Sequence, residues 1–423
     1  MIKIKIATSI LLLFLAGCSD DVAPTAGGVN QNFKMETYCT VPDMAVSLRH
    51  TFIILDEAMI VATQSAEDFA QKNQKMRDAV MGLADPLGAI EQGRTSARER
   101  ITLLVAPLDG SAAKQLFTGC VPGLTAKDRD VLANGQSGAS KFFSGSAEDK
   151  FLEGAAEFRT VMVGALIQSA RTKSSNAAPS ESHFFQSLRN FGQVFASSES
   201  TRRIVLVTDA MPTSSAANDT DSRIQGFDAA KESNLDFGNS GIYILGAGGE
   251  AAQNLARAEA WITAQNGALL GWSKQLEGIS FQPAPTTVAR FVGTSTYPDG
   301  QSLVTKVRIA YDDNGKLVDS WLILTDLNEY AIPLSGQAIC AAADACDFRA
   351  DKGGFAQAWV VQRGSEPTFD EKAPFAGLRE WNMKTAGSKL TGDVFDSAVD
   401  SIAGKTKSKS IPFTATAQLK ATF

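Results

Sequence analysis

Two aspartates that follow apolar runs are the side chains of this chain best placed to do chemistry. Asp56 follows the run Phe52–Leu55, and Asp209 closes the segment Arg203–Asp209, whose apolar run is Ile204–Val207. Apolar residues at consecutive positions are typical of strands buried on both faces, as in the middle of a parallel sheet. If these strands are parallel neighbours, both carboxylates lie at the carboxyl edge of the sheet, where open α/β sheets bind ligands. We therefore predict a binding site at this edge.

Other sets of reactive residues give little support for an enzyme. The two histidines, His50 and His183, belong to no HExxH motif, and the chain has no GxSxG motif. The segment Gly246–Ala251 fits the G-x-G-x-x-A pattern of a dinucleotide site after a strand. The acidic residue that such sites carry about twenty residues later is missing, because residues 262–276 contain no Asp or Glu. We expect no enzyme, with a dinucleotide-binding oxidoreductase using this turn as the alternative.

The elements that must position the two aspartates alternate along residues 45–280. Further apolar strands are expected at Ile101–Val105 and Ile242–Leu245, and a helix at Phe151–Ala170. Strands that alternate with helices predict an α/β fold with a doubly wound, mostly parallel, Rossmann-like sheet. Two helices are predicted from apolar residues at helical spacing, one capped by Ser65 and one with a phenylalanine stripe. The residues that form these two apolar faces are Phe69, Met76, Val80 and Leu83, and then Phe184, Leu188, Phe191 and Phe195.

The character of the chain changes near Ser280, and the segment Gln282–Pro285 reads as a linker. Residues 286–423 are predicted to form a smaller, mainly β domain. Asn314-Gly315 lies between two apolar runs and predicts a hairpin turn, since Asn-Gly favours the tight turns that join strands. The last residues, from Phe413, alternate with period two as a strand does, and one helix is expected near Phe395–Ile402.

The N-terminus has the features of an export signal. Lys3 and Lys5 precede a short apolar core, which is too short for a membrane-spanning helix. The segment Leu15–Cys18 resembles the lipobox of bacterial lipoproteins, which implies cleavage after residue 17 and acylation of Cys18. An ordinary signal peptide that happens to contain a cysteine is the alternative. Residues 18–44 are then expected to be a flexible tether.

The residue after Cys18 bears on the membrane that holds the anchor. Ser19, rather than an aspartate, occupies this position, which by the sorting habit of enteric bacteria implies the outer membrane, facing the periplasm. Asp20 and Asp21 leave the periplasmic face of the inner membrane, or the cell surface, as alternatives.

The four remaining cysteines suggest disulfides, because an even number in an exported chain is typical of an oxidising compartment. Cys340 and Cys346 close a very short loop and are expected to pair, which leaves Cys39 to pair with Cys120. Free buried thiols are the alternative, and the spacing does not indicate zinc. The formal net charge of −6, with Lys and Arg dispersed, gives no sign of a nucleic-acid partner.

Residues 45–280 resemble a von Willebrand factor type A (vWA) domain. The likeness is carried by Phe52–Asp56 as the opening strand, Arg203–Asp209 as a strand of the VTDG type, and Gly241–Gly248 as a strand of the IYVIGVG type. In this family a metal-ion-dependent adhesion site lies at the carboxyl edge of the sheet. It takes one aspartate from a D-x-S-x-S segment, a threonine from a middle loop and a second aspartate.

The resemblance implies a magnesium site that has partly degenerated. Asp56 and Asp209 occupy the two acidic positions, but Ala58 and Ile60 replace both serines. The middle-loop oxygen would come from Thr172, Ser174 or Ser175. Two acids and one hydroxyl make a poor octahedral site, so we expect no bound cofactor, with a magnesium-dependent adhesion protein as the alternative.

Together these features predict a lipid-anchored periplasmic module that binds one or more proteins of the cell envelope and touches the membrane through its N-terminal lipid. The setting implied by family and location is a secretion, conjugation or pilus-related assembly, or envelope maintenance. The predicted interaction surfaces are the loops 56–65, 171–182 and 210–222.

Overall fold

The structure of the protein is a computed structural model. It describes residues 33–135, 138–143, 145–173, 181–191, 201–209, 211, 214–233, 235–246, 251–296, 300, 302–325, 329–351, 356–358, 376–400 and 405–422. The predicted signal peptide and the lipidation site Cys18 lie outside these ranges and remain predictions. Among the described residues, no helix has the length and apolar character needed to cross a membrane.

The first sheet has seven strands in the order β1-β4-β3-β2-β5-β6-β7. Their bounds are β1 (Phe33–Met35), β2 (Arg49–Asp56), β3 (Arg100–Ala106), β4 (Lys114–Cys120), β5 (Thr201–Val207), β6 (Ser240–Leu245) and β7 (Gly267–Ser273). Only the pair β3–β4 is antiparallel among these described strands. Counted from β2, the order is 3-2-1-4-5-6, as in doubly wound sheets. The predicted α/β class with a mostly parallel sheet is confirmed.

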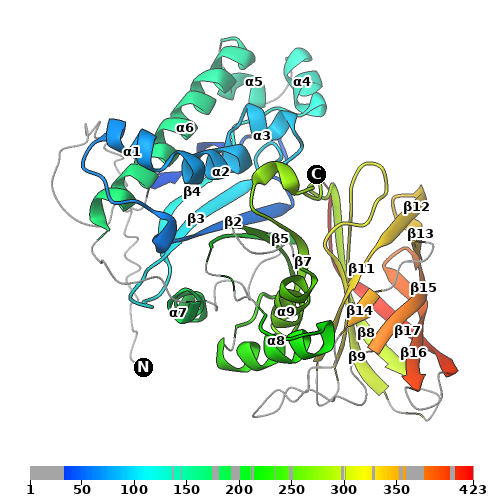
Figure 1. The fold of residues 1–423 in the computed structure, drawn as a ribbon. Coiled ribbons are helices and arrows are strands. Elements are labelled where there is room, and N and C mark those ends of the chain that lie inside the picture. Colours follow the sequence, from blue (N-terminus) through cyan, green and yellow to red (C-terminus); the bar gives the residue numbers. More distant parts are fainter. Residues whose placement is uncertain are drawn as a thin grey trace, which may run out of the picture. The chain divides into compact units, whose positions relative to one another are not determined.

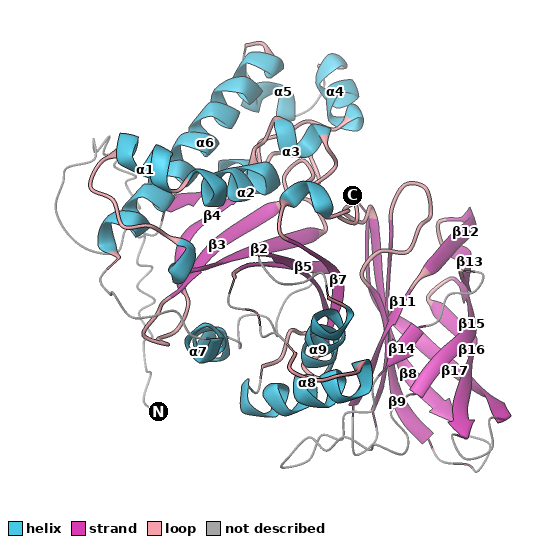
Figure 2. Ribbon diagram, viewed as in Figure 1, coloured by secondary structure: helices cyan, strands magenta, loops and turns pink. Residues whose placement is uncertain are grey.

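Helices cover both faces of this sheet (Figure 1). Their bounds are α1 (Ala66–Lys72), α2 (Gln74–Ala84), α3 (Gly88–Glu91), α4 (Ala126–Ala133), α5 (Gly138–Phe142), α6 (Ala147–Thr172), α7 (Glu181–Phe191), α8 (Asp219–Ser233) and α9 (Ala252–Thr263). Figure 2 shows α1, α2 and α6 over one face and α7, α8 and α9 over the other. Side chains of β2 alternate between the two: Ile53 joins the core under α1, α2 and α6, and Ile54 joins the core under α7, α8 and α9.

The helix predicted after Ser65 is interrupted. Ser65 caps it as expected, since its hydroxyl accepts a hydrogen bond from the backbone N–H of Asp68 at 3.1 Å. At Asn73 the helix divides into α1 and α2, and the side chain of Asn73 turns to the loop that precedes α1. Of the phenylalanine stripe on α7, Phe195 lies outside the described residues.

The folded part begins earlier than expected for a tether that runs to residue 44. Phe33–Met35 forms β1, which pairs in parallel with β4, and Tyr38 and Met44 are buried. The disulfide Cys39–Cys120 joins this segment to β4, as predicted. The prediction of a tether over residues 18–44 is therefore wrong for residues 33–44.

The second sheet has ten strands and is antiparallel throughout its described pairs. Its path runs β11-β10-β9-β8-β17-β16-β15-β13-β12, with β14 beside β15. The bounds are β8 (Thr287–Thr296), β9 (Ser302–Tyr311), β10 (Ser320–Thr325), β11 (Glu329–Leu334), β12 (Gly336–Ala342), β13 (Ala345–Ala350), β14 (Ala356–Ala358), β15 (Ala376–Ala386), β16 (Lys389–Asp400) and β17 (Lys405–Thr422). The predicted mainly β part after the linker is therefore present.

Most local predictions in this part hold. Gly315, with φ +76°, lies in the turn between β9 and β10, which pair as the predicted hairpin, and the alternating C-terminus forms β17. The helix expected near Phe395–Ile402 is wrong, because its described residues continue β16, whose residues from Lys389 to Asp400 pair with β17. The long partner strand supplies the backbone hydrogen bonds that a helix would have made internally.

The second sheet curls enough to bring the end of one edge strand next to the start of the other. β11 and β12 stand at opposite ends of the strand order, yet a single residue, Ser335, separates them in the chain. One apolar core fills the concave side and includes Phe291, Trp381 and Phe413. The disulfide Cys340–Cys346 joins facing residues of β12 and β13, as predicted.

Candidate functional site

The structure places Asp56 and Asp209 at the same edge of the first sheet. β2 and β5 are parallel neighbours with Leu55 opposite Val207, so both aspartates lie at the carboxyl ends of these strands. Asp56 is 3% exposed, whereas Asp209 is exposed to solvent. The two carboxylates are close enough that Asp209 contributes to raising the pKa of Asp56.

The carboxylate of Asp56 is engaged by the protein itself. One oxygen accepts a hydrogen bond from the backbone N–H of Ala58 at 2.9 Å, and the other accepts from the hydroxyl of Thr208 at 2.7 Å. Burial raises the pKa of Asp56 above its usual range, and these two bonds, with Lys173 nearby, offset only part of that effect. Thr208 was not singled out from the sequence, although a hydroxyl directly after the apolar end of β5 and before Asp209 was a usable signal.

Residues 57–65, here called the β2–α1 loop, are tied to the rest of the domain by side chains from other elements. The ammonium of Lys173, directly after α6, donates to the backbone carbonyls of Glu57 at 3.0 Å and Ile60 at 2.6 Å. The carboxylate of Glu57 in turn accepts from the backbone N–H of Leu108 at 2.8 Å. The loop therefore has a fixed course between the ends of β3 and α6.

The middle of the β2–α1 loop is held just as firmly. The side-chain amide of Asn73 accepts from the N–H of Val61 at 2.7 Å and donates to its carbonyl at 2.9 Å. The N–H of Thr63 donates to the carbonyl of Ala170 at 3.3 Å. The side chain of Val61 is nevertheless 45% exposed. The loop thus presents an apolar side chain to solvent while its backbone is bound inward.

The described residues at this edge do not fit a magnesium ion. Magnesium requires near-octahedral oxygen coordination, and Ala58 and Ile60 contribute no side-chain oxygen. The hydroxyl of Thr172 donates to the carbonyl of Gln168 in its own helix at 3.0 Å. Ser174 and Ser175 lie outside the described residues. Across the part of the chain that the structure describes, no group of three or more His, Cys, Asp and Glu side chains is placed to hold a metal.

Close packing explains why a glycine, Gly246, stands at the start of the G-x-G-x-x-A segment. A Cβ on Gly246 would lie 1.5 Å from the carbonyl oxygen of Thr208, so only glycine allows the ends of β5 and β6 to approach this closely. Residues 247–250 of that segment are outside the described ranges. The need for Gly246 is therefore explained without a bound dinucleotide.

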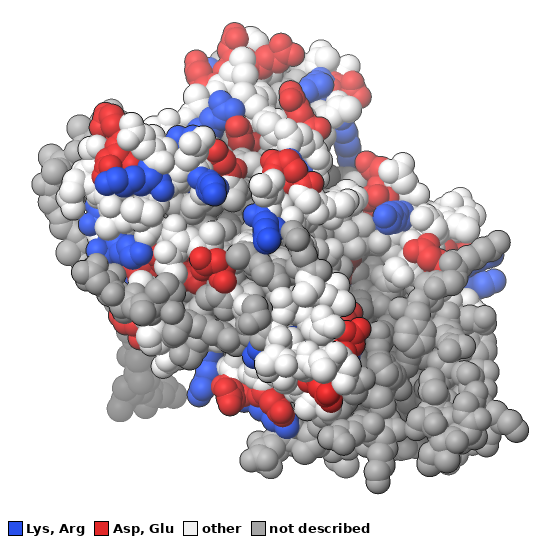
Figure 3. Space-filling view, in the orientation of Figure 1, with Lys and Arg blue, Asp and Glu red and all other residues white. Residues whose placement is uncertain are grey.

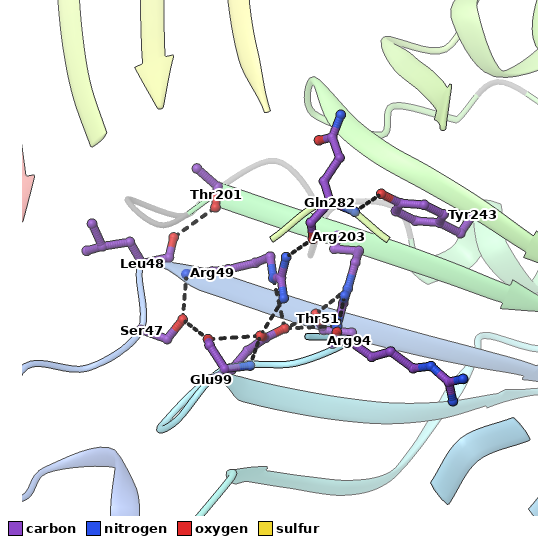
Figure 4. A network of polar contacts seen from close by, with 11 residues as sticks. Ser47, Leu48, Arg49, Thr51, Arg94, Glu99, Thr201, Arg203, Tyr243 and Gln282 are labelled. Carbon is purple, nitrogen blue, oxygen red and sulfur yellow. Dashed lines mark hydrogen bonds and ion pairs between the residues drawn. The ribbon is translucent and has the colours of Figure 1, made fainter. Parts of the chain in front are cut away.

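A second polar cluster lies at the opposite, amino edge of the same sheet (Figure 4). Glu99 is fully buried between Arg49 and Arg203. Arg49 donates to both oxygens of Glu99, at 3.0 and 2.8 Å, Arg203 donates at 3.1 Å, and the hydroxyl of Thr51 also donates to it. Burial alone would raise the pKa of Glu99, but the two arginines hold it at about 2. Glu99 is therefore ionised at neutral pH.

Arg49 and Arg203 also contact the segment that connects the two sheets. Arg49 donates to the carbonyl of Gln282 at 2.7 Å, and the N–H of Gln282 donates to the hydroxyl of Tyr243 at 3.0 Å (Figure 4). The guanidinium of Arg203 lies 5.3 Å from the centre of the Phe281 ring. Sequence reasoning missed this cluster, whose signal was a charged residue at the start of each of two buried strands. Its groups are all engaged in holding structure.

The surface charge shows no field of one sign in the view of Figure 3, where Lys and Arg side chains are interspersed with Asp and Glu. Elsewhere in the described chain, Lys72 pairs with Asp68 and Lys150 with Glu153 in exposed ion pairs, so charges of opposite sign also neighbour each other locally. The described part of this face therefore shows no broad region of one charge that would select a highly charged partner.

Comparison with known proteins gives little beyond the geometry. No family model matches the chain, and no curated protein matches it. Among solved structures, the chain is similar to a von Willebrand factor type A protein from Catenulispora acidiphila, with 11% identity and a TM-score of 0.26. The similarity covers 93% of this chain and 72% of that one. A score this low carries no argument, and the fold stands on the strand order described above.

Proposed function

We propose that this protein is a lipid-anchored, periplasmic docking module of a bacterial cell-envelope assembly, and that it binds a partner protein through the carboxyl-edge loops of its first sheet. The proposed setting is a secretion, conjugation or pilus-related apparatus, or envelope maintenance. The module does no chemistry of its own and holds no cofactor.

The observation that carries the proposal is the β2–α1 loop. Its backbone is bound by Lys173 and Asn73, while the side chain of Val61 is left 45% exposed. A loop fixed in one conformation loses little conformational entropy when a partner binds, which favours affinity. An apolar side chain at its apex offers area that gains free energy when a partner removes it from water. Loops on a rigid scaffold are also where binding residues concentrate.

The compartment is supported by the N-terminal pattern and by the cysteines. Both disulfides are consistent with an oxidising environment such as the periplasm. Acylation at Cys18 would keep the module at a membrane, and the residues before Phe33 would serve as its tether.

The proposal is tested by site-specific photo-crosslinking in native membranes. A photoreactive residue is placed at Val61 and, as the matched control, at Val304 on β9, which has a closely similar exposed fraction of 47%. We expect a discrete crosslinked partner from position 61 and none of the same mass from position 304. Equal products from both positions, or none from position 61, would contradict docking at this edge.

A charge substitution separates docking from mere proximity. Val61→Glu should abolish the crosslink made from a photoreactive residue at Ala62, because burying an unpaired carboxylate in an interface is unfavourable. Val304→Glu should leave it unchanged. Both variants should unfold at the wild-type temperature, since both side chains are largely exposed.

The anchor is tested independently of the partner. The Cys18→Ala variant should be recovered in the soluble periplasmic fraction, whereas the wild type should sediment with membranes. A Cys18→Ala protein that still sediments after a high-salt wash would refute the lipid anchor and leave the docking surface untouched.

A further inference from the structure

We propose that the ammonium of Lys173 replaces a divalent cation at the carboxyl edge of the first sheet, so that the β2–α1 loop is held in place by a covalently attached charge and excludes a metal. This inference concerns the loop itself and does not depend on the identity of a docking partner.

The geometry gives Lys173 a bridging position. It is the first residue after α6, and its ammonium reaches across to two carbonyl oxygens of the β2–α1 loop, those of Glu57 and Ile60. These carbonyls flank Ala58, whose own N–H is bound to Asp56. One side chain thus joins the end of a helix to the loop that follows β2, which is the connection that a shared ion would otherwise make.

The charges of Lys173 and Asp56 are consistent with the bridging position of the ammonium. Asp56 is buried and lies close enough to Lys173 for the ammonium to favour its ionised form. Because the ammonium of Lys173 already places a positive charge on the carbonyls of Glu57 and Ile60, a divalent cation at the same place would be repelled. The two contacts to neutral carbonyls are charge-assisted hydrogen bonds, which are stronger than those between neutral groups.

Among the described residues of this edge, three further positions supply no free side-chain oxygen to an ion. Ala58 and Ile60 have no polar side-chain atoms, and Thr172 is bound to its own helix. Ile60 is fully buried in the core, so a serine there would disturb packing. Ala58 is half-buried and can accept a serine, which makes it the position at which a ligand oxygen can be restored with the least disturbance.

The test measures binding of Mn²⁺ alone to the purified chain, by electron paramagnetic resonance. Three proteins are compared: the wild type, Ala58→Ser, and Ala58→Ser with Lys173→Met. The wild type should bind no Mn²⁺ at this edge, and Ala58→Ser with Lys173→Met should bind Mn²⁺ at least about tenfold more tightly than Ala58→Ser does, because a repelling charge has been removed. Asp209→Ala added to the third protein should abolish that binding.

Two results would overturn the inference. One is Mn²⁺ binding by the wild type that Asp209→Ala removes. The other is equal Mn²⁺ affinity, or equal absence of binding, in Ala58→Ser with and without Lys173→Met.

A second measurement keeps the inference testable if the double variant is unstable. In Lys173→Met alone, hydrogen exchange of the backbone N–H groups of residues 58–63 should be faster by about tenfold or more, and Lys173→Arg should retain most of the protection. Exchange in this segment that is unchanged by Lys173→Met would show that the ammonium does not hold the loop.

Discussion

The side-chain amide of Asn73 makes two hydrogen bonds to the backbone of Val61. Its oxygen accepts from the N–H of Val61 at 2.7 Å, and its nitrogen donates to the carbonyl of Val61 at 2.9 Å. The amide thus satisfies both backbone polar groups of one loop residue, as a neighbouring β-strand would. Asn73 itself is 2% exposed and stands where α1 gives way to α2. The interruption between these helices is therefore the feature that lets one buried side chain hold the proposed recognition loop.

Replacing Asn73 should loosen this loop. Asn73→Ala leaves the N–H and carbonyl of Val61 without their partner, and we expect the free energy of unfolding to fall by about 1–3 kcal/mol. Hydrogen exchange at Val61 and Ala62 should accelerate more than exchange in β2. Asn134→Ala, at an exposed position after α4, is the matched control and should change neither quantity. Slow exchange that persists at Val61 in Asn73→Ala would contradict the assigned role.

His50 should make stability depend on pH in the acidic range. Burial, followed by the charge of Arg100, lowers the pKa of His50 to about 3, from an ordinary value near 6.5. Below pH 6.5 the unfolded chain therefore takes up a proton that the folded chain does not. The free energy of unfolding should fall by about 1.4 kcal/mol per pH unit from this group between pH 6 and pH 4.

The measurement for His50 is urea denaturation at pH 7, 6, 5 and 4. His50→Gln keeps a group that can hydrogen-bond to Thr102, which His50 contacts at 2.9 Å, and removes the titration. The variant should show a shallower decline in stability than the wild type over this range. Parallel curves for the two proteins would show that His50 is not the responsible group.

Glu99 should be among the most sensitive positions in the chain. Glu99→Gln leaves Arg49 and Arg203 buried without a counter-charge, which we expect to cost about 3–5 kcal/mol of stability. Glu153→Gln breaks an exposed ion pair with Lys150 and should cost less than about 1 kcal/mol. A cost for Glu99→Gln no larger than that of the control would show that the buried cluster is not needed for stability.

The pH dependence of the same group has a definite sign. Because the pKa of Glu99 is lowered from 4.5 to about 2, its contribution is fully present above pH 4.5 and is lost as the pH falls towards 2. At neutral pH this contribution amounts to about 3 kcal/mol, since each tenfold difference in proton affinity between the folded and unfolded chain corresponds to about 1.4 kcal/mol. Acid denaturation followed by circular dichroism should therefore begin at higher pH in Glu99→Gln than in the wild type.

The two disulfides should differ in their effect on stability. Cys39–Cys120 spans 81 residues and Cys340–Cys346 spans six. In the chain-entropy description, closing the longer loop stabilises by about 4–5 kcal/mol and the shorter by about 2 kcal/mol. Thermal or urea denaturation of the Cys39→Ser/Cys120→Ser and Cys340→Ser/Cys346→Ser variants measures this difference. A larger loss from the second pair would contradict it.

Sequence reasoning succeeded where a local pattern has one structural solution. The consecutive apolar residues of β2 and β5 specify strands buried on both faces, and their alternation with helices specifies a doubly wound sheet. Asn314-Gly315 marked its hairpin, where Gly315 adopts the positive φ that favours glycine. The disulfides followed from the number and spacing of the cysteines.

It failed where long-range pairing decides the local conformation. Residues from Phe395 to Asp400 form a strand because they pair with β17, and the sequence of the segment does not indicate which strand will pair with it. Phe33–Met35 is a strand for the same reason, since β4 supplies its partner. The break at Asn73 is also tertiary, because its amide is bound to a loop twelve residues earlier.

By itself, the sequence determined the two aspartates at the carboxyl edge, the absence of side-chain oxygens at Ala58 and Ile60, and the class of sheet that carries the aspartates, because strand burial and turn chemistry are local properties. Only the tertiary structure decided what surrounds Asp56 and its loop: the hydroxyl of Thr208, just after the neighbouring strand, bonds to Asp56, and the ammonium of Lys173, just after a long helix, bonds to the carbonyl of Ile60. These contacts join residues more than one hundred positions apart, and a hydrogen bond depends on the distance between atoms, which sequence spacing does not fix at that range.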